Sequence, residues 1–128
     1  ARLQTPLSGL LWAAAKGELA HAQPLVWSED AAVTVVIAAP NYPGTPVTGG
    51  LITGLAAANA IPGAYVLQAG TAAPDADQLV AAGGRVLSVV GLGPTLAAAR
   101  DRAYAAVREI HLEGSHYRTD IALRAALA

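Results

Sequence analysis

The chain has 128 residues, enough for one domain or for one domain with a piece of its neighbour. It lacks cysteine, which excludes disulfides and thiol chemistry, and its net charge of −1 gives no electrostatic basis for binding nucleic acid or an anionic membrane. No apolar run approaches the roughly 18–20 residues that cross a bilayer, and no signal-peptide pattern is visible. We therefore expect a cytoplasmic protein, and the initial alanine predicts a fragment or a processed chain.

The first expected element is a helix between Thr5 and Gly17. Thr5 is placed to cap its N-terminus, Pro6 suits the first helical position, and Gly17 is a typical stop after the basic Lys16. A polar connector over residues 18–30 follows it.

The next element is a strand over residues 31–39. Its continuous apolar run predicts burial on both faces. The following stretch, PNYPGTPVTGGLITG at 40–54, is dense in glycine and proline, which indicates sharp turns or the close approach of a ligand to the backbone. A short strand is expected around Leu51-Ile52, and then irregular alanine-rich chain as far as Pro62-Gly63.

Two further strands are predicted, over residues 65–69 and 85–90. The Gly83-Gly84 pair just before the second of them is typical of a hairpin turn.

From Pro94 to Ile110 the apolar residues recur at helical intervals, with charged residues opposite them. A short final helix is expected to start near Thr119 and to reach Leu127. Together these elements predict an α+β fold, in which a small, mostly antiparallel sheet is packed by one long helix and preceded by an N-terminal helix.

The segment Gly91-Leu92-Gly93-Pro94 follows a strand and opens a helix, where a dinucleotide-binding fingerprint would lie. Leu96 stands where that fingerprint has its third glycine, and Pro94 removes an N–H that a pyrophosphate needs. The segment is therefore interpreted as a strand-to-helix turn with Pro94 as a helix-start residue.

The loop at 40–54 has no lysine and so is not a P-loop. Gly44, Thr48 and Gly49 nevertheless offer N–H and hydroxyl donors to an anion or a ribose. The alternative is a tight loop between two strands, which the residue types alone favour.

The Gly83-Gly84-Arg85 sequence is a stronger candidate for binding phosphate. Two glycines permit close approach of the backbone, and an arginine presents a planar fork of donors that matches phosphate oxygens. The alternative is a solvated arginine at the start of a strand. Arg118 and Asp120 are placed to pair with each other, which favours a structural role.

No catalytic or metal-binding constellation is recognisable. His111 and His116 lack a further ligand at zinc spacing, and the carboxylates are scattered. Phosphoryl transfer from ATP needs acidic magnesium ligands and a basic cradle, and the single lysine, Lys16, lies in the first helix. We expect that the chain does not perform such chemistry alone.

Four blocks, namely the loop at 40–54, QAGT at 68–71, GGRVLSVVGLG at 83–93 and YRTDI at 117–121, resemble in order and spacing the C-terminal domain of phosphoribosylamine–glycine ligases of the ATP-grasp superfamily. The family's loop has the form YPGxYxxGxxI, which this chain matches at Tyr42, Pro43, Gly44, Gly49 and Ile52. It departs with Pro46 for the second aromatic residue, Gly50 for a common aspartate, and Gln68 for the usual histidine.

The resemblance implies a rudimentary single-hybrid motif over residues 29–128, with residues 1–28 as the tail of the ATP-grasp portion. It implies a ligase of purine biosynthesis that uses ATP to join glycine to 5-phosphoribosylamine, giving glycinamide ribonucleotide. ATP and magnesium or manganese are expected in the parent enzyme, outside this chain, whose partners are then the ATP-grasp portion and the two substrates. The isolated chain is expected to be inactive.

The expected role of the domain is to close the active-site cleft and to position phosphoribosylamine. Arg85 is expected to bind the 5-phosphate, helped by Gly84 and by Gly70-Thr71. The loop residues Gly44, Thr48 and Gly49 would face the cleft, and Arg118 and Asp120 would lie near it. Two alternatives remain open: a purely structural or docking domain of the same ligase, and a free-standing protein that binds a small ligand.

Overall fold

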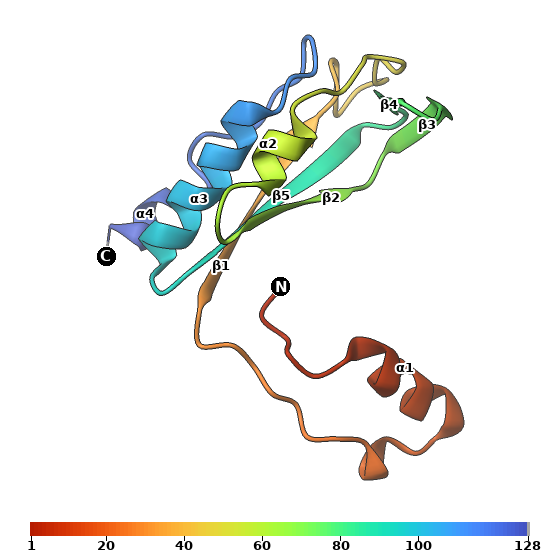
Figure 1. The fold of residues 1–128 in the computed structure, drawn as a ribbon, viewed down its shortest axis with the longest axis vertical. Helices are drawn as coiled ribbons and strands as arrows, with labels where there is room; N and C mark the ends of the chain where they lie inside the picture. Colours follow the sequence, from red (N-terminus) through yellow and green to blue (C-terminus); the bar gives the residue numbers. More distant parts are fainter. Residues whose placement is uncertain (128) are drawn as a thin grey trace.

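The structure is a computed structural model that describes residues 1–127. Figure 1 shows a sheet with helices on one face and an N-terminal arm, residues 1–28, which lies apart from that sheet. In chain order the elements are α1 (Leu7–Lys16), the 3₁₀ turn η1 (Leu19–His21), β1 (Ala31–Ala38), α2 (Leu55–Asn59), β2 (Ala64–Gln68), β3 (Thr71–Asp75), β4 (Gln78–Ala81), β5 (Arg85–Gly93), α3 (Leu96–Glu109) and α4 (Leu123–Ala126). The predicted α+β class is confirmed.

The main sheet has three strands in the order β1-β5-β2, and both pairings are antiparallel. Val89 in the central strand β5 pairs with Val35 on one side and with Val66 on the other. Strands β3 and β4 form a separate antiparallel hairpin beyond one end of this sheet (Figure 1). The core lies between the main sheet and α3, whose Ala99 and Ala103 are fully buried.

The expectation that β1 is buried on both faces is wrong. Val33, Val35 and Ile37 are buried, whereas Thr34 and Val36 between them are exposed. The apolar run therefore faces α3 with every second side chain only, as the two-residue period of a strand requires. The opposite face of the sheet stays open at Val36 despite its apolar side chain.

Three local predictions between β1 and β5 are also wrong. Leu51 and Ile52 make only a bridge and one hydrogen bond to β4, and the alanine-rich chain after them forms the helix α2. Gly83-Gly84 is not a hairpin turn, because β4 pairs with β3 while β5 pairs with β1 and β2. The glycine pair instead carries the chain from the small sheet into the main one.

The long helix α3 is confirmed, although its N-cap is Thr95, whose hydroxyl accepts the N–H of Ala98, and not Pro94. The final helix starts at Leu123 rather than near Thr119. Ala122 has a left-handed backbone with φ of 58°, which interrupts helical geometry just before α4. None of the helices in residues 1–127 is long and apolar enough to cross a membrane.

The prediction that Thr5 caps the N-terminus of α1 is wrong. The Thr5 hydroxyl donates to the carbonyl of Pro24 at 3.0 Å and accepts the N–H of Val26 at 2.7 Å, so it ties the two ends of the arm together. Gly17 has φ of 74° and ends α1 as expected. Because Thr5 is only 8% exposed, its two hydrogen bonds are shielded from water.

Replacing Thr5 by valine should loosen the arm. The substitution keeps the side-chain shape but leaves a shielded N–H and a shielded carbonyl without partners, at a cost of about 1–3 kcal/mol. Hydrogen exchange at the Val26 amide should therefore accelerate. Thr48→Val, at an exposed threonine outside the arm, is the matched control and should leave that amide unchanged.

Candidate functional site

Two adjoining depressions lie where β5 begins. One, of about 620 Å³, is bordered by β1, β5, the turn at 69–70 and the loop after β1. The other, of about 340 Å³, lies between β1 and the segment at 116–121. Val36, Tyr42 and Arg85 line both depressions, so the two form one candidate site.

Arg85 is held at this place by its main chain. The N–H of Gly70 donates to the Arg85 carbonyl at 2.9 Å, and the N–H of Ala69 donates to the carbonyl of Val86 at 3.0 Å. The Arg85 side chain itself is exposed, and its guanidinium makes no hydrogen bond or ion pair with any residue in 1–127. A fixed backbone thus presents an unengaged cation to the depression.

Gly84 is required for the wall that Tyr42 makes. A Cβ at residue 84 would overlap the Tyr42 ring at Cδ2 and lie 3.0 Å from its Cε2. The ring can therefore pack over the start of β5 only because residue 84 has no side chain. Tyr42 was matched to the family's loop motif but not predicted as a site residue.

The structure brings Gly70, Gly84 and Arg85 together at one depression, as the sequence predicted for a phosphate site. Thr71 does not line it, and the Thr71 hydroxyl lies 3.1 Å from Oε1 of Gln68, to which it donates. Val36 also lines the depression and is not among the predicted site residues, because the sequence predicts burial of β1 on both faces; Ser88 of β5 lines it too and was not singled out by any motif.

The loop glycines are used differently. Gly44 donates its N–H to the carbonyl of Asn41 at 2.7 Å, and Gly49 donates its N–H to the carbonyl of Ala81 at 2.7 Å. Neither they nor Thr48 line the two depressions. In this structure the two N–H groups serve the fold, which is the arrangement of the tight-loop alternative.

Arg118 lines the second depression and pairs with Asp120, as predicted. Its Nε and Nη2 donate to Oδ1 and Oδ2 of Asp120 at 2.8 and 2.6 Å. This hydrogen bonding lowers the pKa of Asp120 and raises that of Arg118. Any stabilisation by the pair is complete above the usual pKa of aspartate, about 3.9, and is lost as the pH falls through the lowered pKa.

The charge of the site favours an anion. Two arginines, Arg85 and Arg118, line the two depressions, and no carboxylate is in their lining, although Asp120 is paired with Arg118. Within residues 1–127, histidine and carboxylate side chains form no group of three or more that could hold a metal ion. The arginines that line the two depressions are suited to binding an anionic group.

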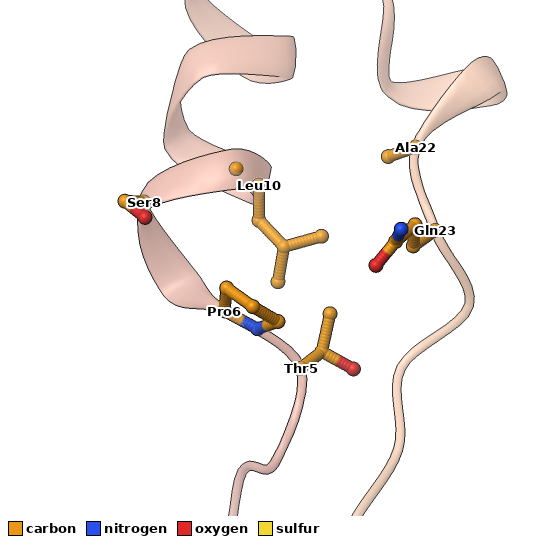
Figure 2. A pocket seen from close by; sticks show the side chains of 7 residues that line it. Thr5, Pro6, Ser8, Leu10, Ala22 and Gln23 are labelled. Atoms are coloured by element: carbon orange, nitrogen blue, oxygen red, sulfur yellow. The ribbon is translucent and has the colours of Figure 1, made fainter.

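A separate hollow lies in the arm and carries none of this chemistry. Figure 2 shows Pro6 and Leu10 of the α1 segment beside Thr5, with Gln23 facing them from the connector. The residues that line it are uncharged, and the Thr5 hydroxyl is already engaged by the connector backbone. The hollow lies between the start of α1 and the connector that follows this helix.

Comparisons with known proteins show the family to which the chain is similar. The family described as "Phosphoribosylglycinamide synthetase, C domain" matches residues 32–124. The chain is 62% identical over 128 residues to the phosphoribosylamine–glycine ligase of Streptomyces coelicolor, covering 98% of this chain and 30% of the relative. It is 52% identical to the ligase of the same name from Caulobacter vibrioides, covering 97% of this chain and 29% of that protein.

A solved structure gives the same result for the fold. The crystal structure of phosphoribosylamine–glycine ligase from Thermotoga maritima superposes with a TM-score of 0.72 at 34% identity. The match covers 90% of this chain and 27% of the Thermotoga chain. The chain thus spans about 30% of the length of the curated relatives it matches.

Proposed function

The chain belongs to the phosphoribosylglycinamide synthetase C-domain family, and we propose that it is the C-terminal part of an ATP-dependent ligase that joins glycine to 5-phosphoribosylamine. Residues 29–128 would form the C-terminal domain and residues 1–28 the tail of the ATP-grasp portion. That portion would bind ATP and magnesium or manganese, and the whole enzyme would act in the cytoplasm.

The proposed task of this chain is to hold phosphoribosylamine by its 5-phosphate. The observation that supports it is the Arg85 guanidinium, which lines the depression without a partner in residues 1–127. Its planar fork suits two phosphate oxygens, and Gly84 and Gly70 line the same depression beside it.

The chemistry would take place at the other end of the substrate. Glycine's carboxylate would be phosphorylated by ATP, and the amine of phosphoribosylamine would then attack the acyl phosphate and release phosphate. Holding the 5-phosphate fixes the direction in which the amine is presented, because binding energy from a remote group contributes to orientation at the reacting atoms. No residue of this chain is assigned a catalytic role.

A docking role is the second candidate, and the arm supports it. Leu7, Leu11 and Trp12 of α1 are each more than half exposed, and no residue of α1 is buried. Such apolar exposure is typical of a surface that another domain covers. Docking by the arm and phosphate binding by Arg85 involve different residues and can be tested separately.

Replacing Arg85 by alanine in the full-length ligase tests the proposal. Loss of charged hydrogen bonds to phosphate, about 1.5–3 kcal/mol, should raise KM for phosphoribosylamine roughly 10- to 100-fold. The KM values for ATP and glycine and the thermal stability should change little. Steady-state kinetics with freshly prepared phosphoribosylamine make the measurement.

Arg108→Ala is the matched control, because Arg108 is exposed in the last turn of α3 and lines neither depression. It removes the same charge and should leave KM for phosphoribosylamine within about twofold. If Arg85→Ala and Arg108→Ala behave alike, the phosphate site is wrong and the docking role is favoured.

A further inference from the structure

Arg118 is a second cation at the same site as Arg85. The two arginines line the 340 Å³ depression from different elements, Arg85 from the start of β5 and Arg118 from the segment after α3. Tyr42 lies between the two depressions as a lining residue of both. A phosphate that reaches Arg85 therefore enters a space that Arg118 also borders.

The backbone that carries Arg118 is fixed by α3. Tyr104 donates its hydroxyl to the Arg118 carbonyl at 2.6 Å and accepts the N–H of Ile121 at 3.1 Å. Arg100 donates to the carbonyls of Thr119 and Ile121 at 2.7 and 3.0 Å. The Arg100 guanidinium also stacks 4.5 Å from the centre of the Tyr104 ring. These contacts clamp residues 118–121 from one side.

The Arg118 side chain, in contrast, is held only by an exposed partner. Its side chain is 74% exposed and that of Asp120 is 53% exposed. Ion pairs at such exposure contribute little to stability, because water and salt screen them. Arginine binds phosphate with the same bidentate geometry with which it binds a carboxylate.

We propose that Arg118 is a second phosphate-binding residue for the same substrate, and that Asp120 occupies its guanidinium until the 5-phosphate replaces the carboxylate. Asp120 then acts as an internal competitor with the substrate. The fixed backbone keeps Arg118 at the mouth of the depression while its head exchanges one anion for the other. This inference rests on the proposed function, since the phosphate is the one assigned to Arg85.

Two substitutions in the full-length ligase should move KM for phosphoribosylamine in opposite directions. Arg118→Ala should raise it roughly tenfold, because a charged hydrogen-bonding group is lost. Asp120→Asn should lower it about two- to fivefold, since the competing ion pair is removed. Inhibition by ribose 5-phosphate, which carries the phosphate but not the amine, should follow the same pattern.

The double variant Arg118→Ala/Asp120→Asn gives the decisive comparison. It should match Arg118→Ala alone, because Asp120 has nothing to compete for without the arginine. Arg124→Ala, which removes a charge from α4 at a residue outside both depressions, is the control and should leave KM unchanged. If Arg118→Ala lowers thermal stability, Arg118→Lys replaces it and should still raise KM, because it lacks the planar fork.

Two results would overturn the inference. One is a rise in KM for Asp120→Asn, which would make the pair a structural support for Arg118. The other is an Arg118 variant that behaves like Arg124→Ala. If Arg85→Ala alone raises KM, the exchange at Arg118 is wrong and the proposed function stands; if neither arginine matters, both fail.

Discussion

An alanine in place of Gly91 should destabilise the core by about 3 kcal/mol or more, at the upper end of the cost of overpacking. A Cβ at this position would overlap the carbonyl oxygen of Ala99 and lie 2.5 Å from the nitrogen of Ala103. Both atoms belong to the backbone of α3, so no side-chain rotation can relieve the clash. The helix would have to move away from β5, which opens the core along its length.

Hydrogen exchange in the full-length protein measures this effect where it arises. The amides of β5 should lose about a hundredfold of their protection in Gly91→Ala, following tenfold per 1.4 kcal/mol. Gly9→Ala in α1 is the matched control, because a Cβ there meets nothing within 4 Å. It should leave β5 unchanged and stabilise α1 by up to about 1 kcal/mol. Unchanged protection of β5 in Gly91→Ala would contradict the packing described here.

The packing of α3 on β5 separates the parts of the fold that local sequence patterns predict from those that they do not. The helix predicted from the period up to Ile110 and the strand predicted from the apolar run at 31–39 follow from local patterns, and both elements are confirmed. The open face of β1 was not predictable in this way, because Val36 is apolar and yet exposed. Whether Val36 is buried depends on which face of the sheet α3 covers. The helix packs on the other face, against Gly91 and Gly93 of β5.

Turns that depend on partners far along the chain were also mispredicted. Thr5 has the sequence signature of an N-cap, yet its hydroxyl serves Pro24 and Val26, about twenty residues away. Gly83-Gly84 has the signature of a hairpin, yet the strands on either side belong to different sheets. In both cases the residue type indicates a hydrogen-bonding group or a flexible backbone. It does not indicate which segment of the chain will be the partner.

For the candidate site, the residue types predicted the kind of ligand group. The sequence did not predict reliably which of these residues lie together. Glycines beside an arginine predicted a place where backbone and guanidinium face an anion together, and Gly70, Gly84 and Arg85 do share a depression. The loop residues Gly44 and Gly49 were expected there too, but their N–H groups bond to Asn41 and Ala81. The N–H of Gly70 is engaged as well, by the carbonyl of Arg85, so a glycine in the sequence does not reveal by itself whether its N–H is free for a ligand.

Tyr104 is another residue whose role the sequence does not reveal, since it predicts only an aromatic residue in a helix. Tyr104 is 8% exposed, and its hydroxyl both donates to Arg118 and accepts from Ile121. In the proposed phosphate site, Tyr104 is therefore a positioning residue for Arg118. Removing the hydroxyl leaves two backbone groups without their partner, at a cost of about 1–3 kcal/mol that falls on the loop.

Tyr104→Phe should raise KM for phosphoribosylamine several-fold in the full-length ligase, with kcat changed by less than about twofold. The ring remains beside Arg100, so α3 stays packed, and the loss is confined to the order of residues 118–121. The amide of Ile121 should exchange faster in the same variant. Tyr65→Phe is the control, because the Tyr65 hydroxyl has no hydrogen-bond partner in residues 1–127 and lines neither depression.

The effect should vanish when Arg118 is already absent. A variant with both Tyr104→Phe and Arg118→Ala should have the KM of Arg118→Ala, since the hydroxyl acts on the substrate only through the residue it positions. A further rise in the double variant would mean that the loop backbone, or Tyr104 itself, supports the substrate by another route. Faster exchange at Ile121 with an unchanged KM would instead show that the order of this loop serves the fold alone.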